Sequence, residues 1–320
     1  MSTREPLRWG VIGTGAIADQ FTEDLALTDS GSVVAVGSRT RDGAERFGER
    51  HAIANRHASY EDLVGDPQVD VVYVATPHPW HRDNALAALA AGKPVLVEKP
   101  FTMNAAEARE VVAGARERDL FVMEAMWTRF LPHIREVRRL LAEGALGEVV
   151  SVIADHDVWV APNAEHRIFA PELGGGALLD LGIYPVSFAS MVLGRPARVV
   201  SVVTPAFTGV DGQTSMIFSY ENGAQAILTT SALALGPVTA AIVGTQARIE
   251  IDRPFYRPSA FTLYPREGDP VRFAPPHEGN GLRHQADEVA RCLREGLRES
   301  PDMPLDETVS IMETVDAVLA

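Results

Sequence analysis

The first 125 residues alternate short apolar runs with helical patterns, and this alternation constrains the fold more than any other feature. Near-continuous apolar strands separated by helices indicate a parallel sheet that is covered on both faces. The predicted strands are Leu7 to Ile12, Val33 to Ser38, Val69 to Ala75, Pro94 to Glu98 and Leu120 to Glu124, and the predicted helices are Ala16 to Leu27, His81 to Ala91 and Ala105 to Glu117. We therefore expect a doubly wound α/β domain.

A glycine motif stands between the first strand and the first helix. It consists of Gly13, Thr14, Gly15, Ala16, Ile17 and Ala18. In such a turn, Gly13 allows the sharp bend, Gly15 lets the backbone approach a pyrophosphate, and Ala18 lets helix and strand pack closely. The helix N-terminus offers free N–H groups to the phosphates. The motif predicts a dinucleotide site, against the alternative of an ordinary glycine turn.

The end of the second strand indicates which dinucleotide is bound. An NAD site places a carboxylate there for the ribose 2′-OH, but this chain has Ser38, Arg39 and Arg41, and its first carboxylate is Asp42. Arg39 can pair with a 2′-phosphate and Ser38 can hydrogen-bond it, whereas a carboxylate would repel it. We expect NADP rather than NAD; the alternative is that the two arginines are solvated loop residues.

Two loops follow later strands, at the sheet edge where such folds bind ligands. The first contains Thr76, His78 and His81, and we expect these residues to position the cofactor or to begin the next helix. No third metal ligand lies near the two histidines, so we expect no zinc site. The second contains Glu98 and Lys99, and the lysine is either an electrostatic and proton-transfer group or a solvated loop residue.

Beyond residue 126 the pattern changes to consecutive strands. A predicted helix from Pro132 to Glu143 leads into a half-buried strand from Glu148 to His156. Further predicted strands are Arg198 to Val203, Ser215 to Tyr220, Ala224 to Ser231, Val238 to Val243, Arg248 to Ile251 and Phe261 to Tyr264. Strands without intervening helices indicate a mostly antiparallel sheet. We expect a dinucleotide-binding domain over residues 1–126 and a substrate-binding and dimerisation domain over residues 127–320.

Two further expectations concern how this second domain packs. Helices must cover one face of its sheet, which leaves the other face for a partner and predicts a homodimer or a higher oligomer. The final helix, Asp306 to Leu319, is expected to pack back toward the first domain.

An apolar, small-residue stretch from Gly175 to Tyr184 carries two polar side chains, Asp180 and Tyr184. Residues four apart lie on one face of a helix, so we expect the carboxylate and the phenol to point in the same direction. A helix start whose tyrosine hydroxyl meets a backbone carbonyl explains this pattern, and so does a catalytic pair.

Charge and cysteine content limit the classes of partner. The net charge of −14 disfavours nucleic acid and anionic membranes, because no basic cluster is present to meet phosphates. The single cysteine, Cys292, fits a reducing cytoplasm and is expected to be a plain buried thiol. The start, MSTREPLRWGVIG, shows no export signal, and no apolar run reaches 18 residues. We expect a cytoplasmic protein.

Over nearly its full length the chain resembles the Gfo/Idh/MocA oxidoreductases. The motifs that carry the resemblance are WGVIGTGAIA, VATPHPWHRDNAL, VLVEKPFTMNAAEA, FVMEAMWTRFLP and RIFAPELGGGALLDLGIYPV. MEAMWTRF and GGGALLDLGIYPVSF are most similar to the branch of dimeric dihydrodiol dehydrogenase, NADP-linked D-xylose dehydrogenase and glucose-fructose oxidoreductase. The resemblance implies a Rossmann domain followed by an α+β domain built on a mostly antiparallel open sheet.

The resemblance also implies a catalytic set of Lys99, Asp180 and Tyr184. Tyr184 would exchange a proton with a substrate carbonyl or hydroxyl, and Lys99 would lower the pKa of the phenol. Asp180 would orient the lysine or bind a neighbouring hydroxyl.

Three further residues are candidates for contact with the substrate. Trp127 lines the pocket by resemblance, or it is a core tryptophan. His156 stands near where branch members often carry phenylalanine, so it would favour hydroxylated substrates unless it is turned outward. Arg167 would hold a substrate or cofactor oxygen, or it would pair with Glu165 or Glu172.

These observations favour an NADP-dependent oxidoreductase that acts on a polyhydroxylated or dicarbonyl small molecule, such as a pyranose or a dihydrodiol. Two other functions remain open. One is a cofactor-binding sensor without turnover, which would have no need of the proton-transfer set. The other is redox-assisted glycoside cleavage, which would show no net change in NADP.

Overall fold

The computed structural model describes residues 5–320, and the chain divides into two compact units. The first unit comprises Met1–Thr102, Ala106–Trp127 and Glu278–Thr308, and the second comprises Met103–Ala105, Thr128–His277 and Val309–Ala320. The chain thus returns to the first unit near its C-terminus. The predicted division into residues 1–126 and 127–320 did not include this return.

One buried carboxylate accounts for this return. Asp24, at the end of the first helix, accepts hydrogen bonds from the backbone N–H groups of Asn280 (2.8 Å) and Leu282 (2.7 Å). This joins the segment before α8 (Arg283–Arg294) to the first unit, whereas most of α9 (Leu305–Leu319) is grouped with the second.

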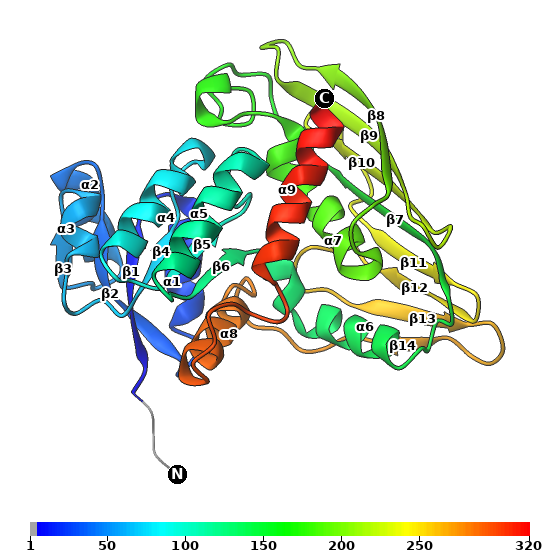
Figure 1. The fold of residues 1–320 in the computed structure, drawn as a ribbon, viewed down its shortest axis with the longest axis horizontal. Helices are drawn as coiled ribbons and strands as arrows, with labels where there is room; N and C mark the ends of the chain where they lie inside the picture. The colour runs from blue at the N-terminus through cyan, green and yellow to red at the C-terminus, as the bar shows by residue number, and fades with distance from the viewer. Residues whose placement is uncertain (1–4) are drawn as a thin grey trace. The chain divides into compact units, whose positions relative to one another are not determined.

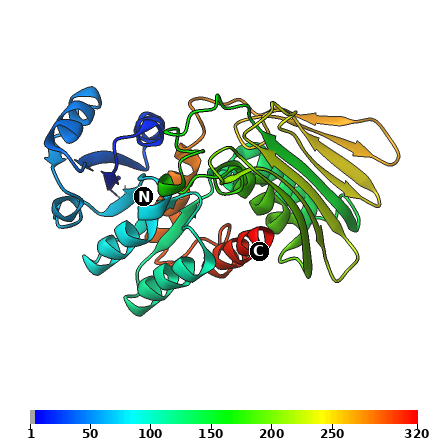
Figure 2. The same cartoon turned by 90° about the horizontal axis from the view of Figure 1, so that it is seen from above.

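The first unit is a doubly wound α/β fold. Its six strands are all parallel, in the order β3-β2-β1-β4-β5-β6. The strands are β1 (Leu7–Ile12), β2 (Gly31–Gly37), β3 (Asn55–His57), β4 (Val71–Val74), β5 (Val95–Glu98) and β6 (Val122–Ala125). The helices are α1 (Ala16–Leu25), α2 (Arg41–Arg50), α3 (Tyr60–Val64), α4 (His81–Ala90), α5 (Ala105–Glu117) and α8. Figure 2 shows helices on both sides of this sheet.

Several short elements of the first unit were not predicted. The helix α2 has the sequence RDGAERFGER, which contains only two apolar residues besides glycine, and both of them, Ala44 and Phe47, are buried. Thr40 caps it by accepting the N–H of Gly43 at 3.1 Å. The strand β3 and the helix α3 are only three and five residues long, which is too short for a periodic pattern to be seen.

The second unit is built on an open sheet of eight strands, in the order β14-β13-β12-β11-β7-β10-β9-β8. All adjacent pairs are antiparallel except β7 with β10, so the predicted fold class is confirmed. The strands are β7 (Val149–Asp157), β8 (Arg198–Pro205), β9 (Asp211–Ser219), β10 (Gln225–Ser231), β11 (Ala240–Gly244), β12 (Ala247–Ile251), β13 (Phe261–Pro265) and β14 (Val271–Phe273). The turn signal at Gly223 was interpreted correctly, since this residue has φ +85° between β9 and β10.

Helices cover one face of this sheet (Figures 1 and 2). They are α6 (Pro132–Ala142), α7 (Ile183–Leu193) and most of α9, and α7 contacts β7 and β10. The stretch Pro171–Leu193 is long and apolar enough to cross a membrane by composition, but 78% of its most apolar window is buried inside the protein. This stretch therefore belongs to the buried core of the second unit and contains α7.

Candidate active site

The glycine motif forms a tight turn from β1 into α1. Gly13 has φ +109°, and a Cβ placed there would lie 2.6 Å from the carbonyl oxygen of Ala75. Gly15 caps α1, and a Cβ at this position would have no atom within 4 Å. Thr14, Ala16 and Ile17 are at least partly exposed around the same turn. A turn with a free helix N-terminus and open space beside Gly15 fits the pyrophosphate of a dinucleotide.

Arg39, just after β2, is held by two aromatic residues. Its guanidinium carbon lies 5.8 Å from the ring centroid of Trp80, and its side chain hydrogen-bonds Tyr60. Burial raises the pKa of the Tyr60 hydroxyl, and the adjacent Arg39 opposes this rise. Sequence reasoning missed both aromatic residues, because neither belongs to the glycine motif or to the strand end.

The other two polar residues of this region are placed differently. Ser38, between β2 and α2, is buried, and its Oγ lies 3.4 Å from the backbone N of Thr40. Arg41 donates to the carbonyl oxygen of Arg56 at 3.0 Å. Of the two predicted arginines, Arg39 is therefore the one that is stacked beside exposed aromatic surface.

The ring of His81 contacts two loops of the first unit. Its ring is fully buried, with Nδ1 2.8 Å from the carbonyl oxygen of Pro100 and Nε2 2.7 Å from that of Thr76. Burial lowers the pKa of His81, although both carbonyl contacts favour the protonated ring. His81 also begins α4, and both of its ring nitrogens contact backbone carbonyl oxygens.

His78 lies next to His81, with the two ring centroids 5.7 Å apart. Thr76 accepts a hydrogen bond from Asn84 at 3.1 Å, which fixes the end of the loop. Within residues 5–320, no group of three or more His, Cys, Asp or Glu side chains is arranged to hold a metal ion.

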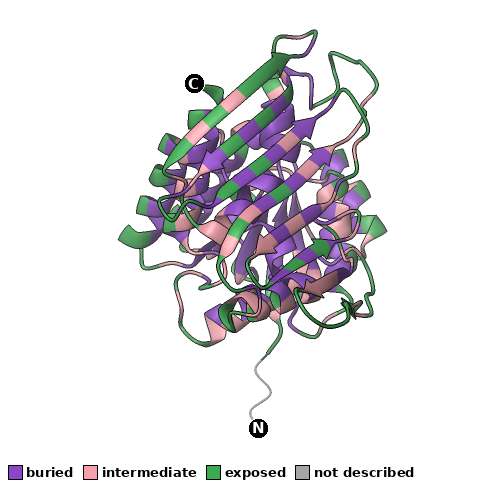
Figure 3. Cartoon of the chain, turned by 90° about the vertical axis from the view of Figure 1, so that its right-hand side faces the viewer, coloured by how far each residue is buried: buried purple, intermediate pink, exposed green. Residues whose placement is uncertain are grey.

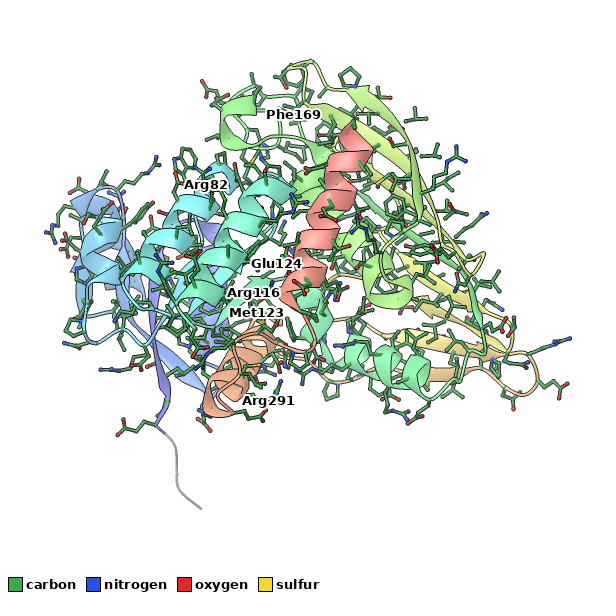
Figure 4. All side chains as sticks on the ribbon, viewed as in Figure 1. Arg82, Arg116, Met123, Glu124, Phe169 and Arg291 are labelled. Carbon is green, nitrogen blue, oxygen red and sulfur yellow. The ribbon has the colours of Figure 1, made fainter. Side chains whose placement is uncertain are left out.

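Lys99 follows β5 in a well-anchored turn. The hydroxyl of Tyr73 donates to Glu98 Oε1, and the backbone N–H of Lys99 donates to Glu98 Oε2 at 3.1 Å. Two residues on, the N–H of Phe101 donates at 3.2 Å to Oε1 of Glu124, which Figure 4 labels on β6. Lys99 itself is half-buried, so its backbone is fixed while its side chain is partly open. Trp127, which follows β6, is buried.

Asp180 and Tyr184 lie on one helix in the second unit. A π-helical turn, Leu178–Gly182, holds Asp180 and runs directly into α7, whose first turn holds Tyr184. Such π-turns occur frequently at functional sites. Arg167 donates to Asp180 Oδ1 at 2.7 Å, so neither Glu165 nor Glu172 is its observed partner. Asp180 is buried, whereas the side chain of Arg167 is 55% exposed.

Two aromatic rings lie beside Tyr184. Its ring centroid is 5.3 Å from that of His156 and 4.7 Å from that of Tyr256, and the last two rings are 4.3 Å apart. His156 is buried, with Nδ1 3.1 Å from the carbonyl oxygen of Leu181, so it is not turned outward. Sequence reasoning missed Tyr256, because it lies in an irregular turn that carries no motif.

The predicted site residues thus form two groups, one in each unit. The first unit holds the glycine turn, Arg39 and Lys99, and the second holds Asp180 with its arginine and Tyr184 with its aromatic neighbours. A hollow of about 360 Å³ is lined by residues 148–150 and 222–224. It lies at the opposite end of β7 from His156, so it belongs to neither group.

Two family models match the chain. One, described as an oxidoreductase family with an NAD-binding Rossmann fold, matches residues 7–126. The other, described as the GFO/IDH/MocA C-terminal domain, matches residues 134–250. Trans-1,2-dihydrobenzene-1,2-diol dehydrogenase of Xenopus tropicalis is 37% identical, with 98% of this chain and 97% of the relative covered. The enzyme of the same name from Mus musculus is 39% identical, with 97% and 95% covered.

Solved structures with the same fold are also found. Aldose-aldose oxidoreductase from Caulobacter crescentus, complexed with glycerol, has a TM-score of 0.90 at 26% identity, with 98% of this chain and 96% of that chain covered. The 3-ketoreductase KijD10 from Actinomadura kijaniata, in complex with NADP and TDP-benzene, has a TM-score of 0.85 at 29% identity, with 98% and 97% covered.

Proposed function

The chain belongs to the Gfo/Idh/MocA family of nicotinamide-dependent oxidoreductases, and on this basis we propose that it is an NADP-dependent sugar or trans-dihydrodiol dehydrogenase. The observation that carries the proposal is the helix on which Tyr184 follows Asp180 by one turn. A phenol of this kind can serve as a proton donor for a carbonyl or as an acceptor for a hydroxyl.

The two groups of residues have separate roles in this proposal. Lys99 and Tyr184 act on the same substrate oxygen: Tyr184 moves the proton, and the Lys99 ammonium lowers the pKa of the phenol from its usual value of about 10. Asp180, paired with Arg167, binds a neighbouring hydroxyl or orients Lys99. The bound nicotinamide supplies the hydride chemistry. The glycine turn would hold the pyrophosphate of the cofactor, and the loop with Thr76 and His78, which His81 fixes through its backbone contacts, would help to position the cofactor.

The substrate is proposed to be a ring with adjacent oxygens. His156 and Tyr256 present ring surfaces beside Tyr184, and aromatic faces pack well against the apolar faces of sugar and diol rings. Trp127, a buried residue of the first unit, is proposed to contact the substrate as well. The relatives named above act, by their names, on a trans-dihydrodiol, on aldoses and on a ketone, and all these substrates share a carbon that alternates between CH–OH and C=O.

The test of this function follows the absorbance of reduced nicotinamide with NADP⁺ or NADPH. The panel contains aldoses, inositols, trans-dihydrodiols and α-diketones. Turnover with one class identifies the substrate and supports the proposal. If the protein binds NADP but turns over no member of the panel, the dehydrogenase proposal fails and a sensor takes its place. Cleavage of a glycoside without net change in NADP would instead indicate redox-assisted cleavage.

Arg39 is proposed to select NADP over NAD, and Arg39→Ala tests this proposal. We expect the Kd for NADP⁺ to rise about 10- to 100-fold, because a charge-assisted hydrogen bond to the 2′-phosphate contributes roughly 1.5–3 kcal/mol. The Kd for NAD⁺ should change less than about threefold. Titration calorimetry with 2′,5′-ADP and 5′-AMP, which differ only in the 2′-phosphate, isolates the effect of that phosphate. Arg46→Ala, on the exposed side of α2, is the control. Equal weakening of both ligands by Arg39→Ala would contradict the assignment.

The uncovered face of the eight-stranded sheet is proposed to pair with a second copy of the chain. Figure 3 shows exposed residues alternating with buried ones along its strands. Val200, Ile217, Ile227 and Ile153 are aligned in register across four adjacent strands, and each is between 43% and 50% exposed. A continuous exposed apolar row of this kind marks an interaction surface.

Ile217→Lys tests the dimer, because it places a charge in the middle of this apolar row. Light scattering after gel filtration should give twice the chain mass for the wild type and the single chain mass for the variant. Leu27→Lys is the control: it exchanges an exposed leucine of the first unit and should leave the mass unchanged. A monomeric wild type, or a variant that stays dimeric, would refute this interface.

A further inference from the structure

The helix that carries Asp180 and Tyr184 begins without a capping side chain of its own. Helical structure starts at Ala177, and the residue before it is Gly176, which has no side chain to accept the first N–H groups. Asp211, the first residue of β9, supplies the acceptor from 33 positions away. Its Oδ2 accepts the N–H of Leu178 at 2.6 Å, and the N–H of Ala177 also bonds to the carboxylate.

Asp211 is held in this role as a carboxylate. Burial raises its pKa to about 6, and the N–H groups of Leu178, of Asp211 itself and of Ala177 oppose the rise. The group is therefore ionised at neutral pH. An ionised acceptor at a helix N-terminus forms a charge-assisted hydrogen bond and interacts favourably with the helix dipole.

The glycine run is fitted closely around this carboxylate. Gly176 has φ +129°, and a Cβ at that position would lie 2.1 Å from Asp211 Oδ1. At Gly175 a Cβ would lie 2.8 Å from the carbonyl oxygen of Ala170. Close packing of the loop against Asp211 and against its own backbone thus explains Gly176 and Gly175.

The loop before the helix and the strands around it form a small apolar cluster of their own. Phe169, labelled in Figure 4, packs there with Ile168, Ala177, Leu181, Ala206 and Ala232. Asp211 adds a polar contact from β9 to the start of the helix. A shift in where the helix starts would move Asp180 and Tyr184 together, since both lie within its first two turns.

We propose that Asp211 is a positioning residue of the active site, because it caps the helix of Asp180 and Tyr184 from the neighbouring strand and so fixes where the phenol is presented. This inference rests on the proposed function. It predicts that loss of the cap lowers kcat while the affinity for the cofactor is kept, since misplacement of a reacting group by about 1 Å can cost on the order of a hundredfold in rate.

The test compares Asp211→Ala with Asp211→Asn in the full-length protein. The asparagine keeps a carbonyl oxygen that can accept the N–H of Leu178, whereas alanine offers no acceptor. We expect kcat to fall about 10- to 100-fold in the alanine variant and to recover to within about fivefold of the wild type in the asparagine variant. The Kd for NADP⁺, measured by calorimetry, should be unchanged in both variants.

Asp155→Ala is the matched control. Asp155 accepts the backbone N–H of Thr239 at 3.0 Å, and both residues lie outside the helix of Asp180 and Tyr184. It should lower the melting temperature comparably and leave kcat intact. If Asp211→Ala kept wild-type kcat, or if Asp155→Ala lost as much kcat, the positioning role would be overturned. If Asp211→Ala does not fold, Asp211→Asn and Asp211→Ser are compared with the wild type instead. We then expect kcat to fall in the order Asp, Asn, Ser at position 211. Equal kcat in all three proteins would also overturn the positioning role.

The outcome is separable from that of the proposed function. If the wild type turns over a substrate in a Tyr184-dependent way and Asp211→Ala does so equally well, only the inference about Asp211 fails. If the wild type turns over nothing, the proposed function fails first.

Discussion

Replacing Tyr184 by phenylalanine is expected to lower kcat by about 10²- to 10⁴-fold, the usual contribution of a positioned proton donor or acceptor. The substitution removes one oxygen atom and keeps the ring, so packing against His156 and Tyr256 should survive. The Kd for NADP⁺ should stay within about twofold of the wild type, because the phenol does not hold the cofactor in the proposed mechanism. Steady-state kinetics and calorimetric titration measure the two quantities separately.

Tyr220→Phe is the matched control for this experiment. Tyr220 is also a buried tyrosine of the second unit, and burial raises its pKa to about 12. Tyr220 directly follows Ser219, the last residue of β9, whereas Asp211 is the first residue of that strand. The same chemical change there should leave kcat unaltered. If Tyr184→Phe retained more than about half of the wild-type kcat, Tyr184 would not be the proton-transfer residue.

The second large effect is expected from the two glycines of the first turn, which should respond in opposite ways to alanine. Gly13→Ala places a Cβ against the carbonyl oxygen and carbon of Ala75, at 2.6 and 2.9 Å, at a residue with φ +109°. Backbone atoms cannot move aside as a flexible side chain can. We expect the cofactor-free protein to lose roughly 2–5 kcal/mol of unfolding free energy, from conformational strain and overpacking combined.

Gly15→Ala should leave the cofactor-free protein almost unchanged. Its φ of −86° suits alanine, and its Cβ would have no atom within 4 Å, so the change in unfolding free energy should stay within about 1 kcal/mol. The affinity for NADP⁺ should instead fall at least about tenfold, because the added methyl group occupies the space that the pyrophosphate needs. Urea unfolding without cofactor and calorimetry with NADP⁺ give the two readouts. If Gly15→Ala bound NADP⁺ normally, the phosphate site would not be at this turn.

Prediction from sequence succeeded where a single local rule determines the outcome. Continuous apolar runs mark buried parallel strands, and the limits of β1 were predicted to the residue. Consecutive strands without helices marked the second sheet. Prediction missed α2, in which only Ala44 and Phe47 of the four buried residues carry an apolar side chain, and β14, which is only three residues long.

The site was predictable to a different extent. Gly13 and Gly15, Lys99, Asp180 and Tyr184 stand in motifs, so their positions were evident from the chain. The partners that hold them were not: the alternatives considered for Arg167 were a substrate or cofactor oxygen and Glu165 or Glu172, and its guanidinium donates to Asp180 instead. Pairings of this kind are set by how a loop folds back on itself, which charge spacing along the chain does not report.

The sequence by itself determined which chemical groups this protein carries and the class of fold that presents them. Both follow from periodicity and from motifs that span a few residues. Only the tertiary structure decided that Tyr256 lies against Tyr184, that Trp80 and Tyr60 hold Arg39, and that Asp211 caps the helix of the GGG motif. The residues of each contact are between 21 and 72 positions apart in the chain, and contacts between such distant segments arise only once strands pair and helices pack.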